Sequence, residues 1–559
     1  MNNSCSNCGT FFEITQGDLD FYDKVSPVFN GKKYPIPPPL LCAQCRLQRR
    51  LAHRNEKTLF KRKCDFTGGS IISVHAPDCG YKVYEKGIWW SDKWDPKEYG
   101  RDFDFSKSFF EQFESLQRAV PRMSLQQDRN ENSDYTNNVS YLKNCYLLFS
   151  ADYSRDSCYG IWVERSNDCF DNYLIDECER TYESFFSSKI YNSCFVYFSS
   201  QCRDSAFLFD CRGCSDCIMC SGLREKQFCI ENKQYSKEEY IKRKQAFNFS
   251  SYAGLLAFNG QFIKFIEGAV RPALRKHGRI IDSTGDLLTD TENCINCYET
   301  AIAKDCKNTI GFKIKDAFDC SYVSGELAYE SCECFPAPFK SVFNINSYTG
   351  SELLYCDLCM NDCQNLFGCA GMKKARYCVL NKQYTKEKYS ALVPKIIDHM
   401  RRTKEFGEFF PAGLSPFGYN ISEAQSCYRL DKPDVLSRGW KWRDETDEIP
   451  KVDKIIPAEL LPDSIDDIPD DILNWAIECE ATKRPFRIVK QELEFYRRMK
   501  LPIPHFHPDE RHRRRIALRN PKKLWKRNCA NCAERIETSY SPDRPERVLC
   551  ERCYLKEVY

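Results

Sequence analysis

The sequence contains no long apolar segment and little histidine. No run approaches the ~20 apolar residues of a membrane-spanning helix, and the first residues, MNNSCSNCGT, lack the charged and then apolar stretches of a signal peptide. We therefore expect a cytoplasmic protein without a membrane partner. Seven histidines in 559 residues supply little general acid–base chemistry. No nucleophile elbow, phosphate-binding loop or HExxH motif is present, which favours a protein that is not an enzyme.

Cysteine, in contrast, is abundant, with 34 residues. In a reducing compartment cysteines are more often metal ligands or buried thiols than disulfides, although an exported, disulfide-rich protein is the alternative. A chain of this length should form several domains. The net charge of +3 hides two strongly basic segments, 46–63 and 511–527, and an acidic one, 444–480.

Eight cysteines are spaced as ligands of two metal ions. Each CxxC pair can place two sulfurs on one tetrahedral ion, and two pairs complete the site. The sequence predicts two Zn²⁺ ions, each with four thiolates: Cys5, Cys8, Cys42 and Cys45 for the first, and Cys529, Cys532, Cys550 and Cys553 for the second.

The first 50 residues also resemble a known family. The motifs are CxxCG, a Phe-x-Ile-Thr strand and a Phe-Tyr helix end in CSNCGTFFEITQGDLDFY, followed by CxxCR in LCAQCRLQRR. They resemble a treble-clef-like zinc-ribbon domain family of bacteria, which implies a zinc-binding fold and no known reaction. The whole chain is similar to multi-cysteine zinc-ribbon proteins of bacteria that share the phrases RIVKQELEFY and RNPKKLW, and this likeness implies no function.

The two ends of the chain are copies of one another. RLQRRLAHRNEKTLFKRKC, which ends at Cys64, and RHRRRIALRNPKKLWKRNC, which ends at Cys529, are identical at 11 of 19 positions. Residues 479–496 likewise match residues 5–22. Each end has lost one metal site: Cys479, Thr482, His507 and Glu510 replace the first set, and Cys64, Thr67, Glu85 and Ile88 replace the second. Loss of a duplicated site is the simpler account, although Cys479, His507 and Glu510 could hold a metal with an open position.

The segment that follows each CxxC or its counterpart predicts a basic helix. Its Arg and Lys residues recur at steps of three and four and so share one face, which can neutralise nucleic-acid phosphates without reading bases. The candidate nucleic-acid-binding residues are Arg46, Arg49, Arg50, Arg54, Lys57, Lys61, Arg511, Arg514, Arg515, Arg519, Lys522 and Lys526. The alternatives are a solvated face and pairing with the acidic segment 444–480.

The middle of the chain is also duplicated. From Tyr141, cysteines and small residues recur every 11–13 positions between short alternating runs and Asn, Asp or Ser turns, which predicts a β-solenoid. A second such region ends like the first, because residues 214–240 align with 363–389 without a gap. Each region holds eleven cysteines. An inward ladder of buried thiols fits this period best, and an iron–sulfur cluster, extra zinc or disulfides are the alternatives.

The predicted fold is mainly β, with small α+β zinc modules that flank two β-solenoid-like regions. The predicted segments are a treble-clef-like finger (1–63), a metal-free ribbon (64–88), an aromatic connector (89–139), the first solenoid (140–245), a helical linker (246–291), the second solenoid (292–400), an acidic connector (401–475), a metal-free finger (476–510) and a basic helix with a zinc ribbon (511–559).

The function that these features favour is non-enzymatic. We expect a zinc-binding protein that binds RNA or DNA backbone through its two arginine-rich helices, with the solenoids as scaffold. A protein–protein interaction scaffold, in which the basic helices pair with residues 444–480, is the first alternative. A carbohydrate-active enzyme built on the solenoid is the second, and it would require clustered acids along one solenoid face.

Overall fold

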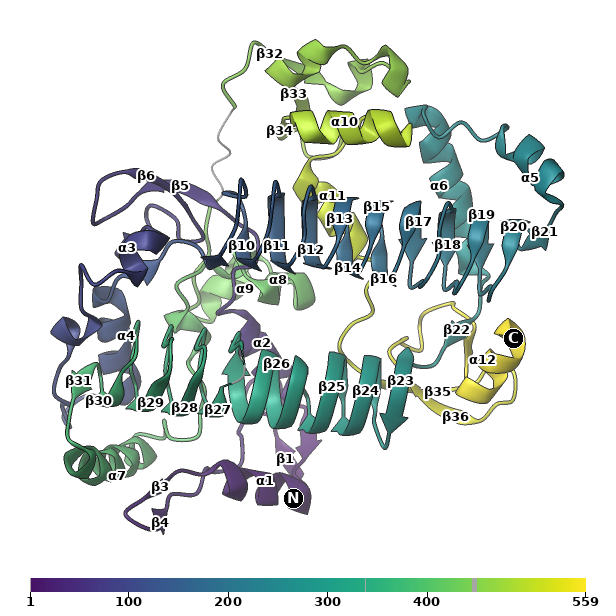
Figure 1. The fold of residues 1–559 in the computed structure, drawn as a ribbon. Coiled ribbons are helices and arrows are strands. Elements are labelled where there is room, and N and C mark those ends of the chain that lie inside the picture. Colours follow the sequence, from purple (N-terminus) through teal and green to yellow (C-terminus); the bar gives the residue numbers. More distant parts are fainter. Residues whose placement is uncertain (1, 337, 445–449) are drawn as a thin grey trace. The chain divides into compact units, whose positions relative to one another are not determined.

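The computed structural model describes residues 2–336, 338–444 and 450–559, and the chain forms two compact units (Figure 1). Unit 1 contains Met1–Leu125, Leu274–Arg443 and Pro521–Trp525, and unit 2 contains Gln126–Ala273, Asp444–Asn520 and Lys526–Tyr559. The first 125 residues therefore share a unit with the second solenoid, and most of the C-terminal segment shares a unit with the first. The predicted fold class, mainly β with two solenoids and cysteine clusters near both termini, is confirmed.

Solenoid 1, in unit 2, is a stack of short parallel strands. Residues 12 positions apart lie side by side on neighbouring coils, for example Tyr146 with Cys158 and Ile161 with Tyr173. Its strands are β9 (Gln127–Asp128), β10 (Asn137–Ser140), β11 (Tyr146–Asp152), β12 (Cys158–Glu164), β13 (Asn167–Phe170), β14 (Tyr173–Asp176), β15 (Glu179–Tyr182), β16 (Phe185–Ser188), β17 (Tyr191–Tyr197), β18 (Ala206–Phe209), β19 (Ser215–Ser221), β20 (Gln227–Ile230) and β21 (Lys233–Gln234).

Solenoid 2, in unit 1, has the same architecture with less regular coils. Neighbouring residues are 12 positions apart between Gly285 and Cys297, but 11 apart between Ala301 and Phe312 and 13 apart between Glu326 and Phe339. Its strands are β23 (Lys276–Ile281), β24 (Gly285–Ile295), β25 (Cys297–Lys307), β26 (Ile310–Cys332), β27 (Phe339–Val342), β28 (Gly350–Leu354), β29 (Cys363–Phe367), β30 (Arg376–Val379) and β31 (Lys382–Gln383).

Side chains point into solenoid 1 at every third position, in place of the two-residue alternation expected of a flat strand. The residue before each inward one adopts left-handed backbone, as at Asn144 (φ 53°) and Leu147 (φ 48°), which precede the buried Cys145 and Leu148. This conformation costs an L-residue ~1–2 kcal/mol unless it is Gly, Asn or Asp. It turns the chain at each step, so that four three-residue sides close one 12-residue coil.

Hydroxyl groups in the narrow interior hydrogen-bond to the backbone of the next coil. The Cys169 amide donates to Ser157 Oγ (3.1 Å) and the Cys217 amide donates to Ser205 Oγ (3.0 Å). The Ser157 hydroxyl in turn donates to the Arg155 carbonyl (2.8 Å). Because a buried N–H without a partner costs ~1–3 kcal/mol, small polar residues suit this core better than leucine does.

Thiols make the same kind of contact inside the solenoids. Cys169 Sγ donates to the Asn167 carbonyl (3.2 Å), and Cys306 Sγ donates to the Lys304 carbonyl (3.2 Å). All 22 solenoid cysteines are buried, and each is a free thiol. The described residues contain two groups of metal-ligating atoms that lie within 4.8 Å of one another, and both groups are outside the solenoids.

Both solenoids close in the same way. After the last parallel strand, β20 and β30 each pair with a two-residue antiparallel strand, β21 and β31. Ser236 then caps α5 (Lys237–Lys244) and Thr385 caps α7 (Lys386–Arg402), each by accepting a backbone N–H three residues ahead. The short antiparallel strand covers the exposed edge of the stack, which would otherwise be open to further pairing.

The terminal modules contain most of the remaining elements. We call β1 (Asn2–Ser4), β2 (Phe11–Glu13), α1 (Gln16–Val25) and α2 (Ala43–Leu51) the N-module, and β34 (Pro485–Phe486), α10 (Lys490–Met499) and α11 (Pro508–Ile516) the C-module. We call β5 (Phe60–Lys63), β6 (Ser70–Ser73) and α3 (Lys86–Trp90) the N-hairpin, and β35 (Trp525–Asn528), β36 (Arg535–Thr538) and α12 (Glu551–Val558) the C-hairpin. Part of the acidic segment 444–480, residues 445–449, lies outside the described residues.

Candidate metal centres and arginine clamps

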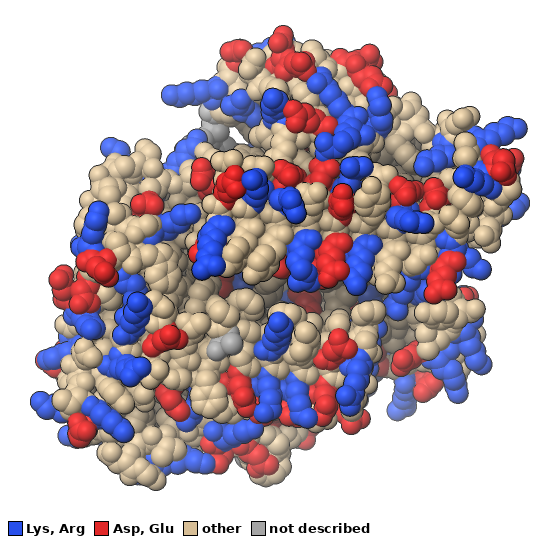
Figure 2. Space-filling model, viewed as in Figure 1, with Lys and Arg blue, Asp and Glu red and all other residues tan. Residues whose placement is uncertain are grey.

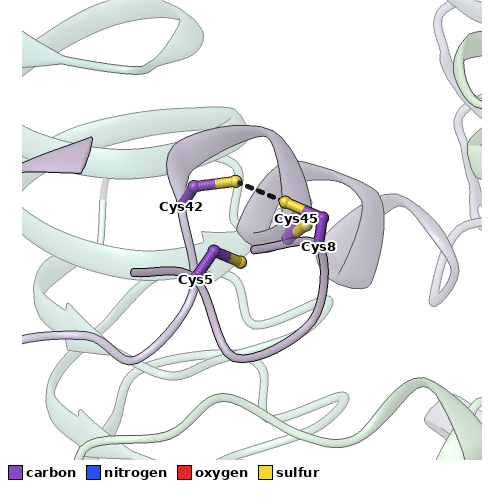
Figure 3. Close-up of side chains that lie close together, drawn as sticks. All are labelled: Cys5, Cys8, Cys42 and Cys45. Carbon is purple, nitrogen blue, oxygen red and sulfur yellow. Dashed lines mark hydrogen bonds between the residues drawn. The ribbon is translucent and has the colours of Figure 1, made fainter. Parts of the chain in front are cut away.

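The first predicted cysteine set converges on one point in the N-module (Figure 3). Cys5 and Cys8 lie on a tight turn after β1, in which the Cys5 amide donates to the Thr10 carbonyl (3.0 Å) and the Gly9 amide donates to the Cys5 carbonyl (2.9 Å). Cys42 is the N-cap of α2 and Cys45 lies in its first turn. The four sulfurs lie within 4.8 Å of one another.

This geometry fits a tetrahedral tetrathiolate ion. A Zn–S bond of ~2.3 Å places two sulfurs of a regular tetrahedron ~3.8 Å apart, and Cys8 Sγ lies 3.7 Å from Cys42 Sγ. Asn7 Nδ2 donates to Cys45 Sγ (3.2 Å), as is common around metal thiolates. A hydrogen bond from the Cys45 thiol, with further ones from Cys8 and Cys5, lowers the pKa of Cys42 to about 5 in spite of burial.

The second set has the same construction in the C-hairpin. Cys529 and Cys532 form the turn between β35 and β36, where the Cys529 amide donates to the Glu534 carbonyl (2.8 Å). Cys550 is the N-cap of α12, and its sulfur lies 3.7 Å from Cys532 Sγ. Burial tends to raise the pKa of Cys529, but the amides of Cys550, Cys532 and Asn531 outweigh it and lower the pKa to about 6. Both predicted ligand sets therefore form groups that could hold a metal.

The N-hairpin keeps the turn of the C-hairpin without its ligands. The Cys64 amide donates to the Gly69 carbonyl (2.8 Å), and Cys64 Sγ accepts the Glu85 amide (3.3 Å), just as Cys529 Sγ accepts the Cys550 amide (3.3 Å). The apolar residues beside the lost site pack into the core of unit 1, which includes Tyr84, Trp89 and Trp94. Burial in this core replaces the metal as the source of stability.

The C-module likewise keeps the turn of the N-module. The Cys479 amide donates to the Arg484 carbonyl (3.0 Å), and His507 caps α11 as Cys42 caps α2, with its Nδ1 accepting the Asp509 amide (3.1 Å). Glu510 accepts hydrogen bonds from Arg513 and Arg514, which lower its pKa to about 2. Cys479, His507 and Glu510 are thus engaged in other contacts and do not form one of the two ligand groups of the described residues.

The arginines of α2 are inserted into acids of solenoid 2. Arg46 Nη2 lies 2.7 Å from Asp319 Oδ2, and Arg50 Nη1 lies 3.3 Å from Glu330 Oε2. Arg50 Nε also donates to Ser321 Oγ (3.1 Å). All four charged side chains are at most 5% exposed. Burial acts to lower the pKa of Arg46, but the neighbouring charge of Asp319 outweighs it and holds the pKa above its usual value. We call this group the first arginine clamp.

Two neighbouring arginines of the N-module extend the clamp. Arg49 bridges Glu408 Oε2 (2.7 Å) and Glu330 Oε1 (3.1 Å). Arg54, which is 1% exposed, donates to Glu56 Oε1 (2.8 Å) and lies over the Tyr322 ring at 4.1 Å. A buried arginine whose charge partner is removed costs several kcal/mol, so these contacts fix where the N-module docks.

The second clamp, in unit 2, repeats the first. Arg511 pairs with Asp171 and, at 3.4 Å, with Glu492. Arg515 Nη2 lies 3.0 Å from Asp171 Oδ1, and its Nη1 lies 2.6 Å from Glu183 Oε1. Arg511 and Arg515 are the counterparts of Arg46 and Arg50 in the sequence repeat. Asp171 and Glu183 occupy the left-handed position on successive coils of solenoid 1, as Asp319 and Glu330 do on solenoid 2.

Aromatic stacking accompanies both clamps. Phe21 of α1 stacks on Phe318 with ring centroids 3.8 Å apart, and its counterpart Phe495 of α10 stacks on Phe170 at 4.1 Å. The next residues also contact matching tyrosines, Tyr22 with Tyr329 and Tyr496 with Tyr182. The whole docking interface between module and solenoid is therefore duplicated, and only the N-module copy has four cysteines.

The predicted nucleic-acid-binding residues lie in different surroundings. Arg46, Arg50, Arg54, Arg511, Arg515 and Lys522 are buried, Arg49, Lys57 and Arg519 are half-buried, and Lys61, Arg514 and Lys526 are exposed. Lys522 pairs with Glu299 at 2.5 Å. Within the described ranges, the acids that pair with the buried arginines of both clamps belong to the solenoids and modules. The scaffold alternative had paired these arginines with segment 444–480.

Sequence reasoning missed the acids of the clamps. They lie in a repeated pattern, Phe-Asp followed 11 or 12 residues later by Tyr-Glu-Ser, which occurs at Phe170–Ser184 and Phe318–Ser331. The repeat was detectable, but nothing in it says which module it contacts.

Solenoid 1 also has a short ladder of acids on a face that the C-module leaves uncovered. Asp152, Glu164 and Asp176 neighbour one another on successive coils. Burial, followed by the charges of Asp152 and Asp176, raises the pKa of Glu164 to about 8. Figure 2 shows that acidic and basic side chains alternate over the visible surface. The ladder is a cluster of the kind that the carbohydrate-active alternative requires.

Comparisons with known proteins add no relative. The chain matches no protein-family model, and a search of curated proteins finds none that is similar to it. Among the described residues no helix is both long and apolar enough to cross a membrane. What the structure supports at the two sites is therefore metal binding by four cysteines each, together with the docking interface that lies next to the first.

Proposed function

We propose that this protein is a non-enzymatic scaffold in which zinc organises a terminal module and thereby docks it on a solenoid. The single observation that supports the proposal is the continuity of α2. Its N-terminus carries Cys42 and Cys45, and Arg46, Arg49 and Arg50 follow directly and enter the acid cluster of solenoid 2. A metal ion at the first position of the helix therefore orients the residues that dock it.

The size of the N-module explains why it needs a metal. So small a segment buries too little apolar surface to fold alone, and a structural zinc ion supplies ~10 kcal/mol or more of folding free energy. The C-module has no such site and relies on its contacts with solenoid 1 and residues 454–478, through α10, α11 and the three-stranded sheet β32 (Lys454–Pro457), β33 (Trp475–Glu478) and β34.

The test combines metal analysis with hydrogen exchange. Anaerobically purified protein should contain two zinc ions per chain. Removal of zinc with a chelator should increase amide exchange at least tenfold in α2 and in the Phe318–Glu330 strand. The same treatment should leave α11 and the Phe170–Glu183 strand protected, because the C-module lacks the metal. Unchanged protection of α2 after complete zinc loss would overturn the proposal.

Nucleic-acid binding is the second candidate, and the exposed basic residues Lys61, Arg514 and Lys526 support it. Phosphate contacts release counterions, so affinity should fall steeply between 50 and 200 mM salt. We expect Lys61→Glu with Lys526→Glu to abolish a gel shift if these residues contact phosphate, while both clamps stay intact. Binding that neither the salt nor the double variant changes would exclude backbone recognition by this surface.

A further inference from the structure

The two cysteine groups share an asymmetry in exposure. In the first, Cys5, Cys42 and Cys45 are 3%, 6% and 9% exposed, whereas Cys8 is an exposed residue. In the second, Cys529, Cys550 and Cys553 are 3%, 7% and 5% exposed, whereas Cys532 is exposed. The exposed ligand is the second cysteine of the CxxC turn in both cases, although the two modules differ in sequence and in surroundings.

The nearest sulfur to the exposed one is also the same in both groups. Cys8 Sγ lies 3.7 Å from Cys42 Sγ, and Cys532 Sγ lies 3.7 Å from Cys550 Sγ. Cys42 and Cys550 are each the N-cap of the following helix. A reagent that reaches the exposed sulfur from solvent therefore finds one particular partner next to it.

The metal-free copies show what this position tolerates. Thr67 in the N-hairpin and Thr482 in the C-module occupy the place of the exposed cysteine, and both copies keep the turn. The first cysteine of the turn is retained and buried in each, as Cys64 and Cys479. The fold of the turn therefore does not depend on a metal ligand at the exposed position.

We propose that Cys8 and Cys532 are oxidation sites at which hydroperoxides open the two metal centres. The inference rests on the proposed zinc binding. The Cys8 thiolate attacks one peroxide oxygen, the O–O bond breaks, and a sulfenic acid and one hydroxide form. The Cys42 thiolate then attacks Cys8 Sγ and expels the second hydroxide as the S–S bond forms. Two thiolates lose two electrons, peroxide gains two, and Zn²⁺ leaves with two of its four ligands gone.

Opening the first centre has a structural consequence beyond metal loss. Cys42 and Cys45 anchor the start of α2, and the arginines of the first clamp lie within its next two turns. Peroxide should therefore loosen the docking of the N-module on solenoid 2. The C-module, whose clamp includes no cysteine group, should stay docked.

The experiment starts from protein shown to carry two zinc ions and treats it with hydrogen peroxide. Zinc release is followed with a chromogenic chelator, and disulfides are mapped by mass spectrometry without reduction. We expect Cys8–Cys42 and Cys532–Cys550 disulfides with one zinc released for each. In wild-type protein, Cys8 and Cys532 should also be the first ligands that a thiol-alkylating reagent labels. This measurement needs no variant.

Matched variants separate exposure from ligand loss. Cys8→His keeps four donors in a Cys₃His set, which is a common structural zinc site, and removes the exposed thiolate. Peroxide-driven release from the first centre should slow at least tenfold in this variant, whereas Cys45→His, at a buried ligand, should release zinc as fast as wild type. Equal slowing in both variants, or disulfides between other pairs, would overturn the inference. Absence of zinc before oxidant is added would instead refute the proposed function, and the inference with it.

Discussion

Arg46 and Asp319 lie 273 positions apart in the chain and form a buried ion pair of 2.7 Å in unit 1. Their counterparts in unit 2, Arg511 and Asp171, form the same pair in the opposite order along the chain. One interface is thus built twice, once with the module before its solenoid and once with the module after it.

Removal of one clamp arginine should destabilise its own unit strongly. Arg46→Met keeps the aliphatic bulk but leaves Asp319 buried without its charge partner, which costs ~3–5 kcal/mol. Arg511→Met should do the same in unit 2. Hydrogen exchange in urea, read separately for α2 and α11, measures both. Arg513→Met, whose side chain is 63% exposed, is the control and should change stability by less than ~0.5 kcal/mol.

Three substitutions should restore metal binding to the N-hairpin. Thr67→Cys, Glu85→Cys and Ile88→Cys together with Cys64 recreate the C-hairpin set, and the turn already presents backbone amides to Cys64 Sγ. The triple variant should bind three zinc ions per chain against two in the parent, as counted by elemental analysis. The matched triple serine variant should keep the parental count. A count of two in the cysteine variant would show that the two hairpins differ more than their backbones indicate.

Unit 1 should lose stability in mild acid because of a buried histidine. Burial lowers the pKa of His53 from 6.5 to about 4. Above pH 6.5 the side chain is neutral in both the folded and unfolded states and has no effect. As the pH falls from 6.5 to 4 the unfolded chain binds a proton that the folded chain refuses, so stability falls by up to about 3 kcal/mol.

The histidine effect can be isolated with two variants. His53→Phe keeps an aromatic ring beside Phe409, which lies 5.5 Å away, and should flatten the pH dependence of unit 1 between pH 7 and pH 5. His277→Gln, at an exposed position, should leave the dependence as in wild type. Thermal unfolding at both pH values, at constant excess zinc, makes the comparison.

The hydroxyl ladder of solenoid 1 predicts that serine is needed at an inward position. Ser157→Ala leaves the buried Cys169 amide without its acceptor and should cost ~1–3 kcal/mol. Ser157→Cys should cost less, because thiols fill the equivalent role elsewhere in the interior. The outward-facing Ser188→Ala serves as control. Chemical denaturation of the three variants gives the ranking, and an alanine variant as stable as the control would contradict the ladder.

The sequence was sufficient to predict the metal ligands and the duplication. CxxC spacing is local, so Cys5 and Cys8 or Cys529 and Cys532 can be identified from chain geometry alone, and gapless repeats reveal copies without any fold. The inward period was harder to see. Left-handed residues such as Leu147 have no composition signal, so an expected alternation of two became a period of three.

The role of the arginines depends on contacts that no local pattern contains. A stripe of Arg46, Arg50 and Arg54 reads equally well as a surface for phosphates and as a face that meets acids. Asp319 and Glu330 decide between these in unit 1, and they follow Arg50 by some 270 residues. Only their repetition at Asp171 and Glu183 would have marked them as a pair.

The position of the first clamp also has a consequence during synthesis. Translation at ~5–20 residues per second separates the emergence of Arg50 from that of Glu330, 280 residues later, by about 14–56 s. During that interval the cationic helix of the N-module has no carboxylates to receive it, whereas α11 emerges to find solenoid 1 already made. The nascent chain must therefore shield one of its two arginine helices and not the other, and a ribosome-bound chaperone with an acidic surface would meet that need.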